Sequence, residues 1–222
     1  MFELWIPVTI AAAFLQNLRS AVQKHLKGRL STTGATFVRF GYGVPVAVAY
    51  VMLLHFGVGL PFPDITGEFV GYVMLGGITQ ILATFLLVYL FGLRNFAVGT
   101  AYSKTEAIQA AVFGFVLLAD PLSTGAAIAI FIGFVGVALI SVAQTDLKTA
   151  SLIKATFSRT AALGLLSGAF FGISAVGFRG GSLALGGGED EFLMQAGYTL
   201  MWGIIFQTII MLIYMQWKEP CL

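Results

Sequence analysis

Apolar residues gather in seven stretches along the chain, and charges or helix-breaking residues separate them. The stretches run approximately over 3–22, 34–56, 68–91, 97–118, 124–143, 161–179 and 192–215. A helix needs about 20 mostly apolar residues to cross the hydrocarbon core of a membrane, whereas a barrel strand needs only about 10 alternating ones. The pattern therefore predicts an all-α integral membrane protein, a polytopic bundle of about seven transmembrane helices.

Composition agrees with this class and excludes several others. With 58% hydrophobic and 10% charged residues, the chain has too little polar surface to cover a water-soluble globule. A single cysteine, Cys221, excludes an internal disulfide framework, and His25 and His55 have no acidic cluster beside them in the sequence. We therefore expect no metal, no cofactor and no enzymatic activity. No basic stripe with interleaved aromatics is present, so no nucleic-acid partner is expected either.

Lys and Arg are distributed unevenly between alternate loops. Arg179 stands by itself on one side, and eight cations fall on the other: Lys24, Lys27, Arg29, Arg94, Lys148, Lys154, Arg159 and Lys218. Cytoplasmic loops carry the excess of Lys and Arg. The bias predicts a multi-pass protein of the cytoplasmic (inner) cell membrane, with its N-terminus outside and the loop after the first helix inside.

The longest polar connection, "QTDLKTASLIKATFSRT", divides the chain unequally. We expect a first five-helix unit over 1–145, a cytoplasmic linker over 146–160 and a shorter second unit over 161–222. Because five is odd, the second unit begins on the opposite membrane face, which produces an inverted repeat. Carriers built this way bind their solute near the midplane, between the repeats.

The chain resembles the EamA-like branch of the drug/metabolite transporter superfamily. The motifs are "ATFVRF" in the second helix and the run "YLFGLRNFAVGTAYSKTEAIQAAVFGFVLLADPLSTGAAIAIFIGFVGVALIS". The sequence departs from the family at Asp120, where relatives usually have Glu, and at Lys104 with Glu106. The resemblance implies ten helices in two inverted five-helix repeats. Since this chain has five plus about two, we expect a C-terminally truncated second repeat and weak transport by the chain on its own.

Polar side chains inside the apolar stretches are the candidate binding residues, because lipid cannot solvate a charge. Lys104 and Glu106 lie about 200° apart around a helix, so they face different surroundings. We select six residues: Glu106, Gln109 and Tyr102 on one stripe of the fourth helix, Gln16 and Arg19 on the first, and Gln80 on the third. The alternatives are an ion pair between Glu106 and an arginine of another helix, Arg19 extending to the membrane surface, and Gln80 joining helices. Arg39 is interpreted as structural.

Two further features concern packing. Gly164, Gly168 and Gly172 recur at four-residue spacing, which lets helices approach closely, and we expect that face to pack within the chain. Pro45 removes one backbone hydrogen bond inside the second helix and predicts a bend there.

The leading functional hypothesis is a secondary carrier of a small amphipathic metabolite or amino-acid-like solute, in the efflux direction. Glu106 is a candidate for carrying a coupling proton during an alternating-access cycle. The alternatives are a seven-helix sensor or receptor and a truncated membrane protein without transport activity. Besides the lipid bilayer and the solute, a second copy of the chain is a candidate partner.

Overall fold

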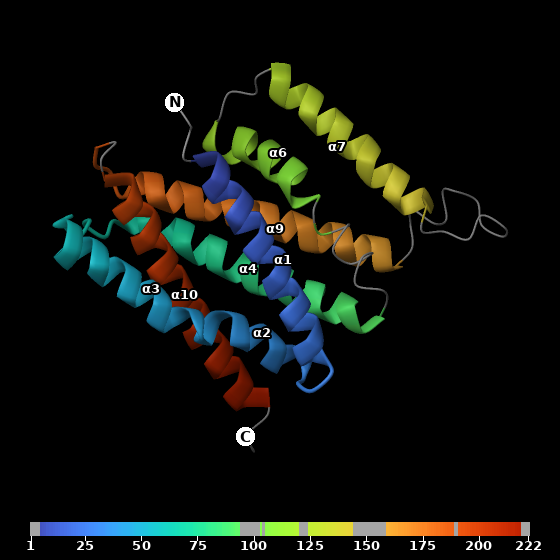
Figure 1. Cartoon of the computed structure of the whole chain (residues 1–222), viewed down its shortest axis with the longest axis horizontal. Coiled ribbons are helices and arrows are strands. Elements are labelled where there is room, and N and C mark those ends of the chain that lie inside the picture. Colours follow the sequence, from blue (N-terminus) through green and yellow to red (C-terminus); the bar gives the residue numbers. More distant parts are fainter. Residues whose placement is uncertain are drawn as a thin grey trace.

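The computed structural model describes residues 5–93, 103, 105–119, 124–143, 159–188 and 191–218, and all regular secondary structure in these residues is helical. The helices are α1 (Trp5–Lys27), α2 (Thr32–Gly41), α3 (Gly43–Met52), the π-helix η1 (Leu53–Val58), α4 (Gly67–Leu93), α6 (Glu106–Leu118), α7 (Thr124–Ala143), α9 (Arg159–Ala184) and α10 (Phe192–Lys218). Figure 1 shows α4, α9 and α10 in the middle, with α1 crossing over α4 and α9 and with α7 at one edge.

Four segments of the described chain are long and apolar enough to cross a membrane: Thr32–Val58, Gly67–Gly92, Ala161–Ala184 and Phe192–Lys218. The helix Glu106–Leu118 is apolar but shorter. The all-helical fold is therefore confirmed, and membrane association has the support of these four helices. The seven spans and the repeat remain predictions. The predicted linker lies almost entirely outside the described residues.

The second span is not one straight helix. It is interrupted at Tyr42, between α2 and α3, and it ends in the π-helix η1. Pro45 cannot donate a hydrogen bond to the carbonyl of Gly41, four residues earlier, so the helix is weakest at that point. The helix is interrupted three residues before Pro45, and the bend itself stays a prediction. Gly59, with φ of 83°, adopts a left-handed conformation at the far end and stops the helix.

Helices α4 and α9 form the most extensive contact in the bundle, and glycines allow it. A methyl group on Gly177 would lie 2.9 Å from the backbone nitrogen of Gly76, so the two backbones touch without intervening side chains. One turn further along, Gly180 lies directly against the ring of Tyr72. Small residues bring transmembrane helices together in this way when no hydrophobic effect operates between them.

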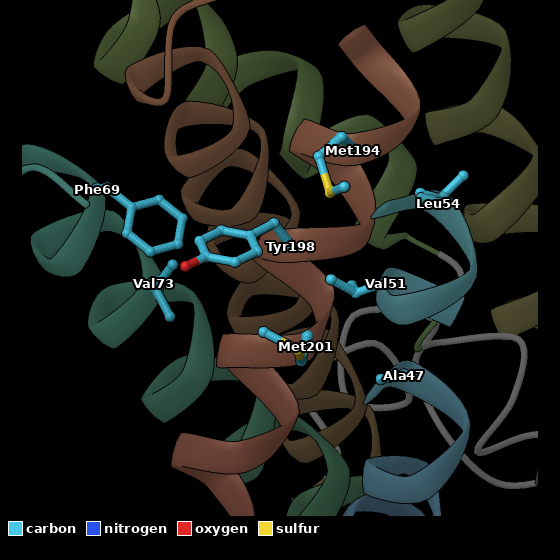
Figure 2. Close-up of a cluster of buried hydrophobic side chains, with 8 residues drawn as sticks. All are labelled: Ala47, Val51, Leu54, Phe69, Val73, Met194, Tyr198 and Met201. Atoms are coloured by element: carbon cyan, nitrogen blue, oxygen red, sulfur yellow. The ribbon is translucent and has the colours of Figure 1, made fainter. Parts of the chain in front are cut away.

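An apolar core joins α3 and η1 to α4 and α10. Its buried members are Ala47, Val51, Leu54, Phe69, Val73, Met194, Tyr198 and Met201. Figure 2 shows the ring of Tyr198 pointing from α10 toward Phe69 and Val73 of α4. The ring centroids of Tyr198 and Phe69 lie 6.2 Å apart. This core fixes α10 beside α4.

The predicted glycine face of α9 packs against α6. A methyl group on Gly168 would lie 3.2 Å from Nε2 of Gln109, and one on Gly172 would lie 3.2 Å from the Phe113 ring. The expectation of packing within the chain is thus confirmed for Gly168 and Gly172, and Gly164 is buried. Helix α7 lies beyond α6, where Gly133 approaches the side chain of Ile108.

Candidate functional site

A charged cluster forms where Arg19 of α1, Arg39 of α2 and Glu106 of α6 approach one another. Glu106 lies close enough to act electrostatically on both guanidinium groups, and Arg19 acts on Arg39, although no direct ion pair joins the three side chains. Three separate helices therefore contribute ionisable side chains to one region of the bundle. Glu106 and Arg39 are half-buried, whereas Arg19 is exposed on the surface of the isolated chain.

Arg39 connects this cluster to the two central helices. Its Nη1 donates a hydrogen bond of 2.7 Å to Oγ1 of Thr84 in α4. Its guanidinium carbon also lies 5.3 Å from the ring centroid of Phe171 in α9 and 5.6 Å from that of Phe40. Cations within about 6 Å of a ring centroid are attracted to its face. These contacts support the structural interpretation of Arg39, although no spacing pattern points to Thr84 as its partner.

The polar stripe of α1 faces the bundle beside the charged cluster. Ser20 is buried and donates a 3.0 Å hydrogen bond to the carbonyl oxygen of Gln16, which is half-buried. Gln23 is 3% exposed, and neither atom of its side-chain amide has a hydrogen-bond partner among the described residues. Polar side chains of α1 therefore face inward at Ser20 and at Gln23, near the C-terminal end of the helix.

Gln109 bridges α6 and α9. Its Nε2 donates to Oγ1 of Thr105 at 2.8 Å and to the carbonyl oxygen of Leu165 at 3.3 Å. Gln109 thus has a packing role at the α6–α9 contact, next to Glu106. Tyr102 and Lys104, which belong to the same predicted helix, lie outside the described residues.

A cavity of about 300 Å³ opens between α4, α9 and α10. Its lining combines amide, hydroxyl and guanidinium groups with apolar side chains: Gln80, Phe178, Arg179, Ser182, Ala196, Thr199, Leu200, Ile204 and Gln207. At its inner wall, Nε2 of Gln207 donates a 2.7 Å hydrogen bond to Oε1 of Gln80. Ligand pockets typically have this mixture of an apolar lining and a few polar groups.

The described candidates fall into two regions rather than one site. Glu106, Arg19, Gln16 and Gln109 lie in or beside the charged cluster, whereas Gln80 lies in the cavity. Sequence analysis missed Gln207, although a glutamine in the middle of the last apolar stretch is as unusual there as Gln80 is in the third. The other residues were found because their spacing places them on one side of a helix. Such spacing does not indicate which residues of two different helices contact each other.

A scan against protein-family models finds no match, and searches of curated proteins and of solved structures find no similar chain.

Proposed function

We propose that the protein is a secondary carrier that moves a small amphipathic metabolite or amino-acid-like solute across the cell membrane. In this proposal it works by alternating access, in the efflux direction, and is an EamA-like member of the drug/metabolite transporter superfamily. The seven apolar stretches are seven spans, of which the last two begin an inverted second repeat. The resemblance of the second and fourth helices to that family supports the assignment.

The observation that carries this proposal is the charged cluster. Arg39 of α2 is held by Thr84 of α4 and Phe171 of α9, and Arg19 and Glu106 lie close enough to act on its charge, in a chain whose helices are otherwise strongly apolar. Ionisable groups inside a membrane are costly, and they mark solute or ion pathways when they face a bundle interior. The closest helix contact that the structure describes, between α4 and α9, uses glycine instead, at Gly76 and Gly177.

Counterflow in liposomes tests the carrier function. Vesicles containing the purified chain are loaded with one unlabelled solute from a panel of amphipathic metabolites and amino acids, and uptake of the labelled solute is followed. A carrier exchanges the label selectively and saturably, and counterflow detects even slow exchange. Solute binding without any exchange would contradict carriage and favour a sensor.

Glu106→Gln separates transport from structure within the same assay. The variant keeps the shape of the side chain and removes the charge that acts on Arg19 and Arg39. If Glu106 carries a coupling proton or binds solute, the variant folds normally but loses exchange or its dependence on pH. If it serves only as an ion-pair partner, melting temperature and yield fall instead. Glu68→Gln, at an exposed acidic residue in the first turn of α4, is the matched control.

A further inference from the structure

Two hydrogen bonds at the inner wall of the cavity fix the orientation of two glutamine side chains. Nε2 of Gln207 donates to the carbonyl oxygen of Gly77 at 3.2 Å and to Oε1 of Gln80 at 2.7 Å. A backbone carbonyl only accepts, so the amide nitrogen of Gln207 must face Gly77. The same nitrogen needs an acceptor on Gln80. The oxygen of Gln80 therefore faces Gln207, and its nitrogen points elsewhere.

The side-chain nitrogen of Gln80 is a donor that a ligand can reach. Gln80 is half-buried and lines the cavity. Its Nε2 has no hydrogen-bond acceptor among the described residues, and it is not enclosed by surrounding atoms as Oε1 of Gln207 is. An amide nitrogen carries two N–H donors. The cavity therefore has a donor that the protein itself does not use.

The ring of Phe178 gives the cavity an apolar wall that is held in place. The ring lies between α4 and α10, where a methyl group on Gly76 would lie 3.0 Å from it and one on Gly203 would lie 2.7 Å from it. Two helix backbones therefore contact the ring directly. Leu200 and Ile204 of α10 extend the apolar surface. A matching ligand has an apolar body beside the group that meets Gln80.

The inner wall favours a ligand without charge. Gln80 lies near the middle of the span Gly67–Gly92, and both glutamines of this wall are neutral. A charged group is costly at that depth of a membrane when no opposite charge meets it. Arg179, the charged residue of the lining, is exposed and already has an interaction. A carbonyl oxygen therefore suits the donor of Gln80 better than a carboxylate does.

We propose that the cavity between α4, α9 and α10 binds an uncharged carbonyl compound with an apolar body, such as a ketone or an ester. Nε2 of Gln80 donates to the carbonyl oxygen, and the apolar body lies on Phe178 and Ile204. Gln207 does not touch the ligand. It is a positioning residue that keeps the donor side of Gln80 turned toward the cavity. The assignment rests on the proposed carrier function for its role, because the cavity would then hold the transported solute.

Photolabelling with benzophenone tests the site, because its carbonyl group accepts a hydrogen bond and also inserts into nearby C–H bonds under ultraviolet light. The purified chain in lipid nanodiscs is labelled, and mass spectrometry identifies the labelled peptides. We expect saturable labelling of α4 and α10 at the cavity.

Three competitors test the role of the carbonyl group, each at the same measured concentration in the bilayer. Phenyl benzoate keeps a carbonyl acceptor, diphenylmethane has no polar group, and diphenylamine mainly donates. Since one hydrogen bond is at stake, phenyl benzoate should compete about fivefold better than either of the others. Equal competition by all three compounds, or labelling that does not saturate, would overturn the proposal.

Two variants locate the labelling. Ala196→Phe places a ring in the cavity from an exposed position, and Ala49→Phe places the same ring at an exposed position of α3 away from the cavity. Ala196→Phe should abolish saturable labelling, while Ala49→Phe leaves it unchanged. Saturable labelling that survives Ala196→Phe sinks the cavity assignment.

Gln207→Leu separates positioning from packing. Without its hydrogen bond to Gln207, Gln80 can turn its oxygen toward the cavity, so diphenylamine should compete as well as phenyl benzoate. A merely structural role would lower the melting temperature and leave the preference for phenyl benzoate intact, which would contradict positioning. Gln80→Leu offers no polar atom, so phenyl benzoate and diphenylmethane should compete equally. Melting curves report whether both variants fold.

The counterflow assay keeps this proposal apart from the carrier function. Saturable labelling that is lost in Ala196→Phe, without exchange of any solute by the unchanged chain, would support the site and contradict carriage. Exchange that persists unchanged in Ala196→Phe would support carriage and contradict the role of the cavity in holding the solute.

Discussion

The charged cluster and the cavity use the same two central helices in opposite ways. In the charged cluster, Thr84 of α4 and Phe171 of α9 hold Arg39, which comes from α2. In the cavity, α4 and α9 contribute Gln80 and Arg179 directly, and α10 completes the wall with Gln207. Gln80 and Thr84 are one turn apart, about 6 Å along the axis of α4. One helix therefore supports two neighbouring polar regions of different chemistry.

The difference between them lies in how polar atoms are satisfied. In the charged cluster, the hydroxyl of Thr84 and two aromatic faces hold the guanidinium of Arg39, and Glu106 acts on it from farther away. In the cavity, neutral amides and hydroxyls bond to each other and leave one acceptor over, on Gln207. A substitution at Arg39 therefore removes contacts to two other helices at once, whereas each hydrogen bond in the cavity joins a single pair of neutral groups.

The largest effect that we expect is a difference in thiol labelling between the two sides of the membrane, which shows the side nearest to the charged cluster. Arg39 lies seven residues after the start of α2 and Arg19 eight residues before the end of α1, so the cluster is about 10–12 Å from the connection between them. We predict that this connection is cytoplasmic. In a Cys221→Ser background, an impermeant thiol reagent applied to intact cells should label Asp64→Cys strongly and Gly28→Cys not at all. The reverse pattern would place the charged cluster nearest the outside.

The second prediction concerns the close contact between α4 and α9, the two helices that the charged cluster and the cavity share. Gly177→Ala places a methyl group 2.9 Å from the Gly76 backbone nitrogen, which forces α4 and α9 apart. Overpacking of this kind costs about 1–3 kcal/mol. A lower melting temperature should follow. Gly71→Ala, where an added methyl group meets nothing within 4 Å, should leave the melting temperature unchanged or raise it slightly.

A third prediction concerns the charged cluster alone. Arg39→Met removes the hydrogen bond to Thr84 and leaves Glu106 with less positive charge around it. Since hydrogen bonds to charged groups contribute about 1.5–3 kcal/mol, the melting temperature should fall clearly. An unchanged melting temperature would contradict the structural role of Arg39.

The smallest effect should come from Gln23→Leu. Gln23 is buried with both amide atoms unpartnered, so an apolar side chain of similar size removes an unmet hydrogen-bonding requirement. We expect stability to rise by about 1 kcal/mol, measured as melting temperature in detergent. Ser20→Ala on the same stripe is the control, because its hydroxyl is bonded to Gln16 and its removal should not stabilise. A destabilised Gln23→Leu would show that the amide has a partner in the membrane.

Sequence analysis predicted the helices well because apolar runs and helix breakers act locally. The ends of α4, α7 and α10 lie within a few residues of the predicted ends, and the effect of Pro45 follows from its missing N–H group. The glycine face of α9 was also predictable, since its spacing repeats within one helix.

The pairing of side chains between helices was not predictable in the same way. Gln80 and Gln207 are 127 residues apart, and their hydrogen bond depends on how far α10 is shifted along α4. Arg39 was assigned a structural role on its position, but its partner Thr84 is small, common and without a spacing signal. Such contacts depend on how two helices are shifted and rotated relative to each other, and no repeating residue spacing in the sequence indicates this.

The backbone contact between Gly76 and Gly177 has a consequence for ion leakage. With no room even for a methyl group between the helices, no file of water molecules can pass between α4 and α9 at that height. Protons and small cations cross membranes readily through such files. Peptide backbone packed this closely therefore seals that part of the contact between the two central helices against water.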